Sequence, residues 1–308
     1  MNISASKRGL NAMISRFSSF LSRAITGLGL AAVSFFAAAA SGWVPVGGDF
    51  ATILNSKSNS IVVWQLVENP EVMVIDFPTM TQQGHTFNRI TQLTEQFNEP
   101  YKRVLTTAEL NKYFESIRRS DATFAYGHDV LMSELALFFN LAERDKVELY
   151  PEEIALRDFV IEQKLVRGWR GMYQALKPDT VLVSVPQTRE KGDGEPKIND
   201  LARRAILTHE LAHGEYYSNP YYANYCRKFW AEILTDNQRE AFTRFLSKYN
   251  YSVNQDELLI NEMQAYLIFT PDPNSFSASK LGVKDEELEV MRFAFRRGRP
   301  PTRLPLYN

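Results

Sequence analysis

Short runs of branched apolar residues predict three β-strands in this chain. They cover residues 61–67, 72–77 and 180–185, where Val, Ile and Leu are frequent. Such side chains pack well on a pleated sheet. Four residues, among them Pro70, separate the first two runs, so these are expected to form a β-hairpin.

Apolar residues at helical spacing fill most of the remaining chain. The periodic residues lie at 87–97, 107–117, 131–141, 221–233, 236–246 and 258–269, and another helix is expected to begin at Pro151. A further, largely buried helix is expected to open after Asn199 or Asp200, because both residue types are good N-caps. We therefore predict an α+β fold, mostly helical, with a small sheet whose edge strand, 180–185, precedes that buried helix.

The first forty residues differ in composition from the rest. A leader with basic but no acidic residues precedes an apolar stretch, 24–40, that ends in consecutive alanines before Ser41. This pattern is typical of a signal peptide cut near Ala40. An uncleaved membrane anchor is the alternative, since residues 24–44 are just long enough to span a bilayer. In both cases we expect the protein outside the cytoplasm, either periplasmic or secreted, or held at a membrane.

Composition narrows the possible functions. With 35 basic and 36 acidic residues among 308, the chain has a net charge of −1 and no dominant basic patch, which argues against nucleic acid as a partner. Cys226 is the only cysteine, so no intramolecular disulfide can form. After the signal peptide or anchor of residues 1–40, we expect an N-terminal α+β region at 41–178 and a catalytic region with a helical C-terminal part at 179–308. The sequence does not indicate an oligomeric state.

The chemistry is concentrated in one stretch of the buried helix, His209-Glu210-Leu211-Ala212-His213. Residues four apart lie on the same face of a helix, so His209 and His213 can present two imidazoles to one metal ion. Glu210 is rotated by about 100° from His209, which lets its carboxylate reach a water on that metal without ligating the metal. Neutral imidazoles suit Zn²⁺. The alternative is an ordinary pair of histidines one turn apart.

A catalytic zinc takes three protein ligands, so a third donor is needed. Glu262 is the favoured candidate, because it adjoins the apolar helical stripe that contains Leu259 and Met263. A carboxylate beside such a stripe is costly unless it is paired or binds a metal. Glu215 would point to a different face of the helix. The other acidic candidates are Glu232, Asp236, Asp256 and Glu257.

His209-Glu210-x-x-His213, preceded by a strand and followed by a later helix with a glutamate, resembles the zincin metallopeptidases. A glutamate as third ligand resembles the gluzincin branch of that group. The resemblance implies that His209, His213 and Glu262 bind zinc and that Glu210 activates the water. It covers roughly residues 180–270.

Two features depart from related patterns. The metzincin pattern has a glycine and a histidine where this chain has Tyr216 and Asn219, which disfavours that branch. The usual second gluzincin motif has an aspartate where this chain has Tyr266. The acid that orients one histidine in that motif must therefore come from elsewhere, if this protein has one.

The predicted function is a zinc-dependent hydrolase, most simply a metallopeptidase that acts on a peptide or protein. Strand 180–185 is expected to pair with an extended substrate. The alternatives are a zinc hydrolase of a non-peptide envelope component and a non-catalytic exported protein with a structural metal site. Several residues are candidates for stabilising an oxyanion, and the sequence does not choose among them. They are Tyr216, Tyr217, Tyr222, Tyr266 and His128.

Overall fold

The computed structural model describes residues 42–96 and 102–304, all of which belong to one unit of the chain, 39–308. The predicted signal peptide or anchor lies outside the described residues and stays a prediction. Among the residues described, no helix is both long and apolar enough to cross a membrane. The architecture is α+β and mostly helical, with a five-stranded mixed sheet, which confirms the predicted fold class.

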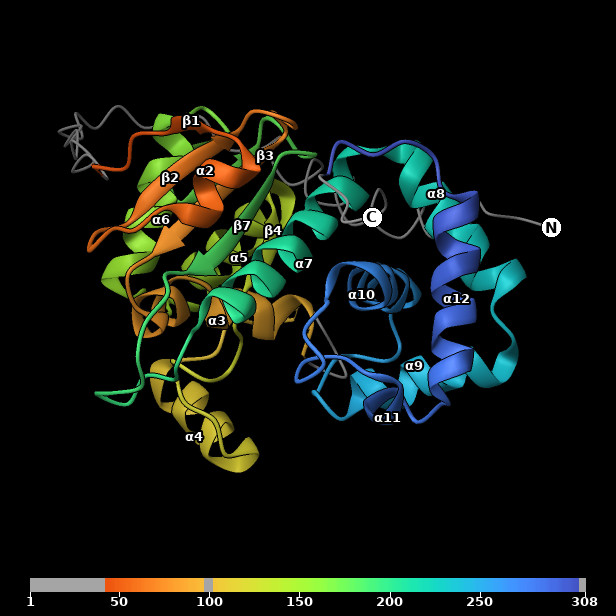
Figure 1. The fold of residues 1–308 in the computed structure, drawn as a ribbon. Coiled ribbons are helices and arrows are strands. Elements are labelled where there is room, and N and C mark those ends of the chain that lie inside the picture. The colour runs from red at the N-terminus through yellow and green to blue at the C-terminus, as the bar shows by residue number, and fades with distance from the viewer. Residues whose placement is uncertain (1–41, 97–101, 305–308) are drawn as a thin grey trace, which may run out of the picture. The chain divides into compact units, whose positions relative to one another are not determined.

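The five-stranded sheet has the order β1-β2-β3-β7-β4 (Figure 1). Its strands are β1 (Val46–Gly48), β2 (Val62–Leu66), β3 (Val72–Phe77), β7 (Val181–Pro186) and β4 (His128–Leu131). The predicted hairpin is confirmed, since β2 and β3 pair antiparallel. β3 runs parallel to β7, whereas β4 runs antiparallel to β7.

The prediction that the strand before the buried helix is an edge strand is wrong. β7 lies inside the sheet, between β3 and β4, and all six of its residues are buried. An uninterrupted apolar run is typical of a strand covered on both faces and paired on both sides. The edge strands are β1 and β4, and neither is among the three strands predicted from the sequence. The expected boundary at residue 178 would divide this sheet, because β7 follows that residue whereas both of its neighbours, β3 and β4, precede it.

Helices cover both faces of the sheet. The longer helices are α3 (Met80–Thr94), α4 (Thr107–Ile117), α5 (Met132–Asp145), α6 (Pro151–Glu162), α7 (Asp200–Ser218), α9 (Asp236–Ser247), α10 (Asp256–Phe269) and α12 (Asp285–Gly298). The shorter ones are α2 (Phe50–Asn55), α8 (Pro220–Lys228), η2 (Phe229–Ile233, a π-helix) and α11 (Ala278–Leu281). Helices form at all the predicted places, although the one predicted at 221–233 is divided into α8 and η2. α3 begins earlier than its periodic residues indicate, because Thr79 caps it.

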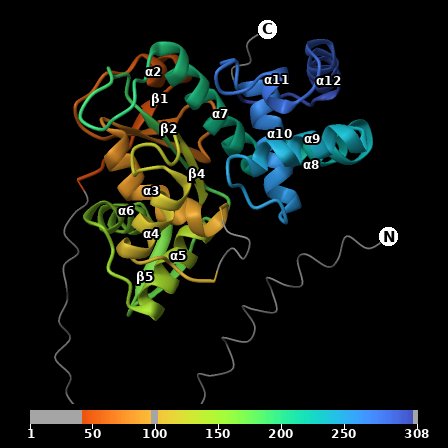
Figure 2. The ribbon, with the colours of Figure 1, turned by 90° about the horizontal axis from the view of Figure 1, so that it is seen from below.

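Alternating side chains of the sheet enter two separate cores. Val72 and Val183 face α7, whereas Met73 and Leu182 face the side covered by α3, α5 and α6. The remaining helices, α8 to α12, gather on the side of α7 away from the sheet (Figures 1 and 2). α7 is therefore enclosed between the sheet and these C-terminal helices. A two-stranded hairpin that the sequence does not predict, β5 (Val166–Trp169) with β6 (Met172–Ala175), packs on α5.

A buried arginine fixes the start of α7 on the sheet. Arg203 donates to both carboxylate oxygens of Asp76 on β3, at 2.9 and 2.8 Å. It also donates to the carbonyl of Pro186 on β7 and to the carbonyls of Ile53 and Leu54 on α2. Removing one partner of a buried, fully hydrogen-bonded ion pair of this kind strongly destabilises the fold. The position of α7, and of every side chain it presents, is therefore tied to β3, β7 and α2.

Candidate metal centre

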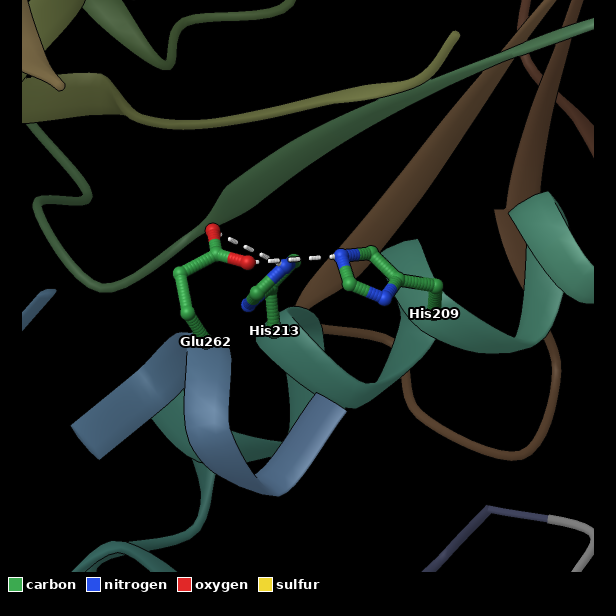
Figure 3. A group of neighbouring side chains, drawn as sticks. All are labelled: His209, His213 and Glu262. Carbon is green, nitrogen blue, oxygen red and sulfur yellow. Dashed lines mark ion pairs between the residues drawn. The ribbon is translucent and has the colours of Figure 1, made fainter. Parts of the chain in front are cut away.

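The two motif histidines lie in the middle of α7, whose first turn is capped by Asn199. His209 and His213 project from one face of the helix toward Glu262 on α10 (Figure 3). His209 Nε2 lies 3.5 Å from Glu262 Oε2, and His213 Nε2 lies 3.6 Å from Glu262 Oε1. The structure thus brings the three predicted ligands together, with one donor atom of each within 4.8 Å of the others.

Packing between α7 and α10 sets the distance between the histidines and the glutamate. The Thr208 hydroxyl donates to the carbonyl of Phe269 at the end of α10, at 2.6 Å. Near the middle of α10, Gln264 accepts a hydrogen bond from the buried Tyr222 hydroxyl of α8 at 2.8 Å. α10 is thus held at its end by α7 and near its middle by α8. Glu262 therefore extends toward the histidines from a helix that is fixed in place, and not from a flexible loop.

The donor set fits a divalent metal. Glu262 is 2% exposed, yet its Oε2, the oxygen nearest His209 Nε2, has no hydrogen-bond partner among the described residues. Buried polar atoms are normally paired, so an orphaned atom here calls for an explanation. Two imidazoles and one carboxylate form the ligand set of many catalytic zinc sites. The residues present therefore fit such an ion.

The tautomer of His209 is fixed by Thr270. The Thr270 hydroxyl donates to the carbonyl of Ala265 at 3.0 Å, so it accepts from His209 Nδ1 at 2.8 Å. The proton of His209 is thereby held on Nδ1, and Nε2, the atom that faces Glu262, keeps a free lone pair. Outer hydrogen bonds of this kind orient metal-ligating histidines. At His209, therefore, a threonine and not an acid makes the orienting hydrogen bond.

Glu210 lies beside the three donors, against the sheet. Its carboxylate contacts the backbone of Gly127, the residue that precedes β4: a Cβ at Gly127 would lie 2.2 Å from Glu210 Oε1. Asp129 on β4 projects to the same place, with its Oδ1 3.8 Å from His213 Nε2. Asp129, Glu210 and His213 form a second group whose donor atoms lie within 4.8 Å of one another.

Burial and mutual repulsion shape the protonation of the site. Burial lowers the pKa of His209 to about 4 and raises the pKa of Glu262 to about 7. Burial, followed by the charges of Asp129 and Glu262, raises the pKa of Glu210 well above its ordinary value. Since a metal ligand must be deprotonated, His209 is ready to bind at neutral pH, whereas Glu262 is partly protonated there and would release its proton on binding a cation.

An open cavity of about 490 Å³ gives access to these residues. Its lining includes His209, Glu210, His213 and Glu262, so the donor set is buried within the protein yet reachable from solvent. A pocket of this size holds a small molecule or a short peptide segment. The site therefore has the access that a catalytic centre requires.

The remaining sequence candidates lie in different places. Of the suggested oxyanion stabilisers, Tyr266 and His128 line this cavity, but His128 is hydrogen-bonded to Ser184 and Asn88 on the other face of the sheet. Tyr216 and Tyr217 line a neighbouring pocket, and the Tyr222 hydroxyl is bound to Gln264. The other acids suggested as third ligand, and Glu215, are absent from the possible metal-binding groups found among the described residues. Those acids are Glu232, Asp236, Asp256 and Glu257.

Comparison with models of known protein families, with curated proteins and with solved structures finds no match for this chain.

Sequence reasoning missed four residues of this site: Gly127, Asp129, Tyr251 and Thr270. Tyr251, in the loop before α10, lines the cavity and hydrogen-bonds with Glu262. Gly127 and Asp129 flank His128, which is one of the oxyanion candidates above. The polar residues around His128, at the start of a short strand, were therefore the signal that could have indicated them. For Thr270 the only signal is its position just after the helix that carries Glu262.

Proposed function

We propose that the protein is a zinc-dependent hydrolase that cleaves peptide bonds. The observation that carries the proposal is the convergence of His209, His213 and Glu262, with an orphaned buried oxygen on Glu262, at an open cavity beside the carboxylate of Glu210. His209 and His213 through their imidazoles, and Glu262 through its carboxylate, would hold the ion. Zinc in such a site polarises a carbonyl and lowers the pKa of water.

The chain's own residues have defined tasks in this proposal. Glu210 takes a proton from water at its carboxylate and delivers that proton to the leaving amine. Burial and the neighbouring carboxylates raise the pKa of Glu210 in the metal-free protein, so the positive charge of the ion would be needed to keep this carboxylate ionised as a base. Gly127 gives the Glu210 carboxylate room against the sheet, and Thr270 keeps His209 in one tautomer.

The outer edge of β4, which pairs with no other described strand, is where we expect an extended substrate to bind. β4 ends the sheet, and β7, the strand first expected to bind substrate, has both of its edges paired. A peptide can add to an exposed strand edge through main-chain hydrogen bonds. β4 also starts directly after Gly127, whose backbone contacts Glu210. A peptide aligned on β4 would therefore pass beside the proposed general base.

A second candidate function is a structural metal site. A structural zinc is normally closed by a fourth protein ligand, and Asp129, whose Oδ1 lies 3.8 Å from His213 Nε2, is a possible fourth donor. The open cavity at the site favours the catalytic alternative. A zinc hydrolase of a non-peptide envelope component would use the same residues, so only substrate profiling separates it from a peptidase.

The decisive experiment compares the native protein with Glu210→Gln. Each is loaded with one equivalent of zinc, its zinc content is measured by mass spectrometry, and its activity is measured on a mixture of short peptides. We expect both to hold one zinc and only the native protein to cleave. Glu286→Gln, an exposed glutamate on α12, is the matched control. Equal cleavage by native and Glu210→Gln protein would refute the mechanism. Zinc binding without any cleavage by the native protein would refute the peptidase and leave the structural site and the non-peptide hydrolase.

A further inference from the structure

The hairpin of β5 and β6 is held to the protein by one of its two faces. The backbone of Tyr173 exchanges two hydrogen bonds with the side chain of Asn140 on α5, both at 2.8 Å. The Tyr173 ring also packs against the ring of Phe139, with the ring centroids 5.4 Å apart. On the neighbouring strand, a Cβ at Gly168 would lie 2.9 Å from Cδ1 of Ile161 on α6. This inner face is therefore closely packed on α5 and α6.

The outer face of the hairpin is apolar at its tip. Successive side chains of a strand point to opposite faces, so Trp169 and Met172, which pair across the two strands, lie on the face opposite to Gly168 and Tyr173. Trp169 and Met172 are 59% and 53% exposed, and Leu176, directly after β6, is 46% exposed. Single exposed apolar residues are ordinary, whereas a group of them with a polar rim is typical of an interaction surface.

The turn between the two strands makes this tip narrow. Arg170 and Gly171 alone connect β5 with β6, and both have a positive φ, 51° and 74°. Two-residue turns with positive φ at both positions join antiparallel strands tightly. Trp169 and Met172 are thereby brought together at the end of the hairpin. The Arg170 guanidinium lies 4.8 Å from the centre of the Trp169 ring, so the tip combines an apolar surface with a positive charge.

Positive charge predominates around the tip. Residues 163–178 contain four basic side chains and no acidic one, although the whole chain is almost neutral. Arg167 donates to the side-chain oxygen of Gln174, which is a neutral partner. Glu143 on α5 lies beside Gly171, but it is paired with Lys146 at 3.0 Å. The four basic residues, all exposed, are Lys164, Arg167, Arg170 and Lys177.

We propose that this hairpin is a membrane-contact surface. Trp169 and Met172 enter the interface of a bilayer that contains anionic phospholipids, and the four basic residues bind the lipid phosphates. Tryptophan is enriched at membrane–water interfaces, because its large ring is apolar whereas its N–H can donate a hydrogen bond. Each lysine or arginine near an anionic leaflet strengthens binding about fivefold.

A bilayer fits this surface better than a protein partner does. A stable protein interface takes about 20–30 residues on each side. β5 and β6 have four residues each, and half of these face inward. Binding to a bilayer depends on apolar area and on attraction to anionic lipids, and it needs no partner of complementary shape. A narrow apolar tip with a basic rim therefore suffices.

Fluorescence quenching reports whether Trp169 touches lipid. The chain has four tryptophans, and bromine atoms on lipid chains quench the emission of those that reach the bilayer. Native, Trp169→Phe and Trp230→Phe proteins are mixed with vesicles of brominated phosphatidylcholine that contain phosphatidylglycerol as the anionic component. We expect quenching in the native and Trp230→Phe proteins and loss of most of it in Trp169→Phe, because phenylalanine keeps the apolar contact but not the emission. Equal quenching of all three proteins overturns the inference.

The control tryptophan lies far from the hairpin. Trp230 belongs to η2, which stands between α8 and α9 in the chain, and Figure 2 shows these two helices far from β5. All three proteins share the predicted signal peptide or anchor. Quenching of Trp43, which closely follows that segment, would therefore be the same in each of them. It cannot imitate the loss expected for Trp169→Phe.

Replacing two basic residues tests the role of lipid charge. Arg167→Gln combined with Lys177→Gln removes two charges outside the turn, so the lipid concentration that gives half of the maximal quenching should rise about 25-fold. Arg296→Gln combined with Arg297→Gln, at exposed positions of α12, is the matched control and should leave that concentration unchanged. An unchanged value in the hairpin variant overturns the inference. Equally strong quenching of the native protein by vesicles of brominated phosphatidylcholine alone also overturns it.

A second copy of the chain as the partner would give a different result. The emission of the native protein would then change with protein concentration in the absence of lipid, and Trp169→Phe would lose this change. That outcome also overturns the membrane-contact surface. No residue of β5 or β6 lines the cavity at the metal centre, and none of these measurements uses zinc or a peptide. The inference therefore stands or fails independently of the proposed hydrolase.

Discussion

Replacing Gly127 with alanine should disable the proposed general base without disturbing the metal site. The new Cβ would lie 2.2 Å from Glu210 Oε1 and 2.5 Å from Glu210 Cδ, whereas ordinary contacts begin at 3.4 Å. The carboxylate must therefore retreat by more than 1 Å, because β4 and α7 are both anchored on β7. A misplacement of about 1 Å in a catalytic group can lower the rate about 100-fold, which corresponds to about 2.7 kcal/mol of transition-state stabilisation.

The assay measures kcat and KM on the best peptide substrate of the native protein, together with zinc content. For Gly127→Ala we expect kcat to fall about 100-fold, with one zinc retained and a smaller change in KM, because the three atoms nearest to the new methyl group all belong to Glu210 and none to a proposed metal ligand. Gly192→Ala is the matched control, since nothing lies within 4 Å of a Cβ at that position. If Gly127→Ala keeps more than a third of the native kcat, Glu210 does not act from the position described here.

Two further predictions concern the metal. Thr270→Val removes the oxygen that accepts a hydrogen bond from His209 Nδ1. In a competition with a chelator, the zinc affinity of this variant should be about 10- to 100-fold lower than that of the native protein. An unchanged affinity would show that the hydrogen bond does not orient His209. The raised pKa of Glu262, about 7, means that this group is protonated below that pH in the metal-free protein and must release the proton to bind zinc. Zinc affinity should therefore weaken as the pH falls below 7, and His209, with its pKa lowered to about 4, should contribute little to this loss above pH 5. A flat profile between pH 5.5 and 7 would contradict it.

The sequence by itself determined the features that depend on local geometry. The spacing of His209 and His213 places both imidazoles on one face, because a helix has a fixed number of residues per turn. The cap at Asn199 and the apolar periodicity of α7 and α10 are equally local, and both helices form where the sequence predicts them. The apolar residues beside Glu262 predicted that its side chain is buried. This burial selected it as the third ligand among the acidic residues that follow His213.

Only the tertiary structure decided which distant segments meet at the site. The order of strands in a sheet depends on pairing between segments far apart in the chain, so an apolar run identifies β7 as a strand but not as an edge or a centre. Pairing of β4 with β7 brings Gly127 and Asp129 to Glu210 and His213, more than eighty positions further along the chain. No periodicity in residues 120–131 encodes that contact, because it arises from the packing of α7 across the completed sheet. The proposed ligands of the metal could therefore be predicted from the sequence, whereas the space for the general base and the approach of Asp129 to His213 exist only once the sheet has formed.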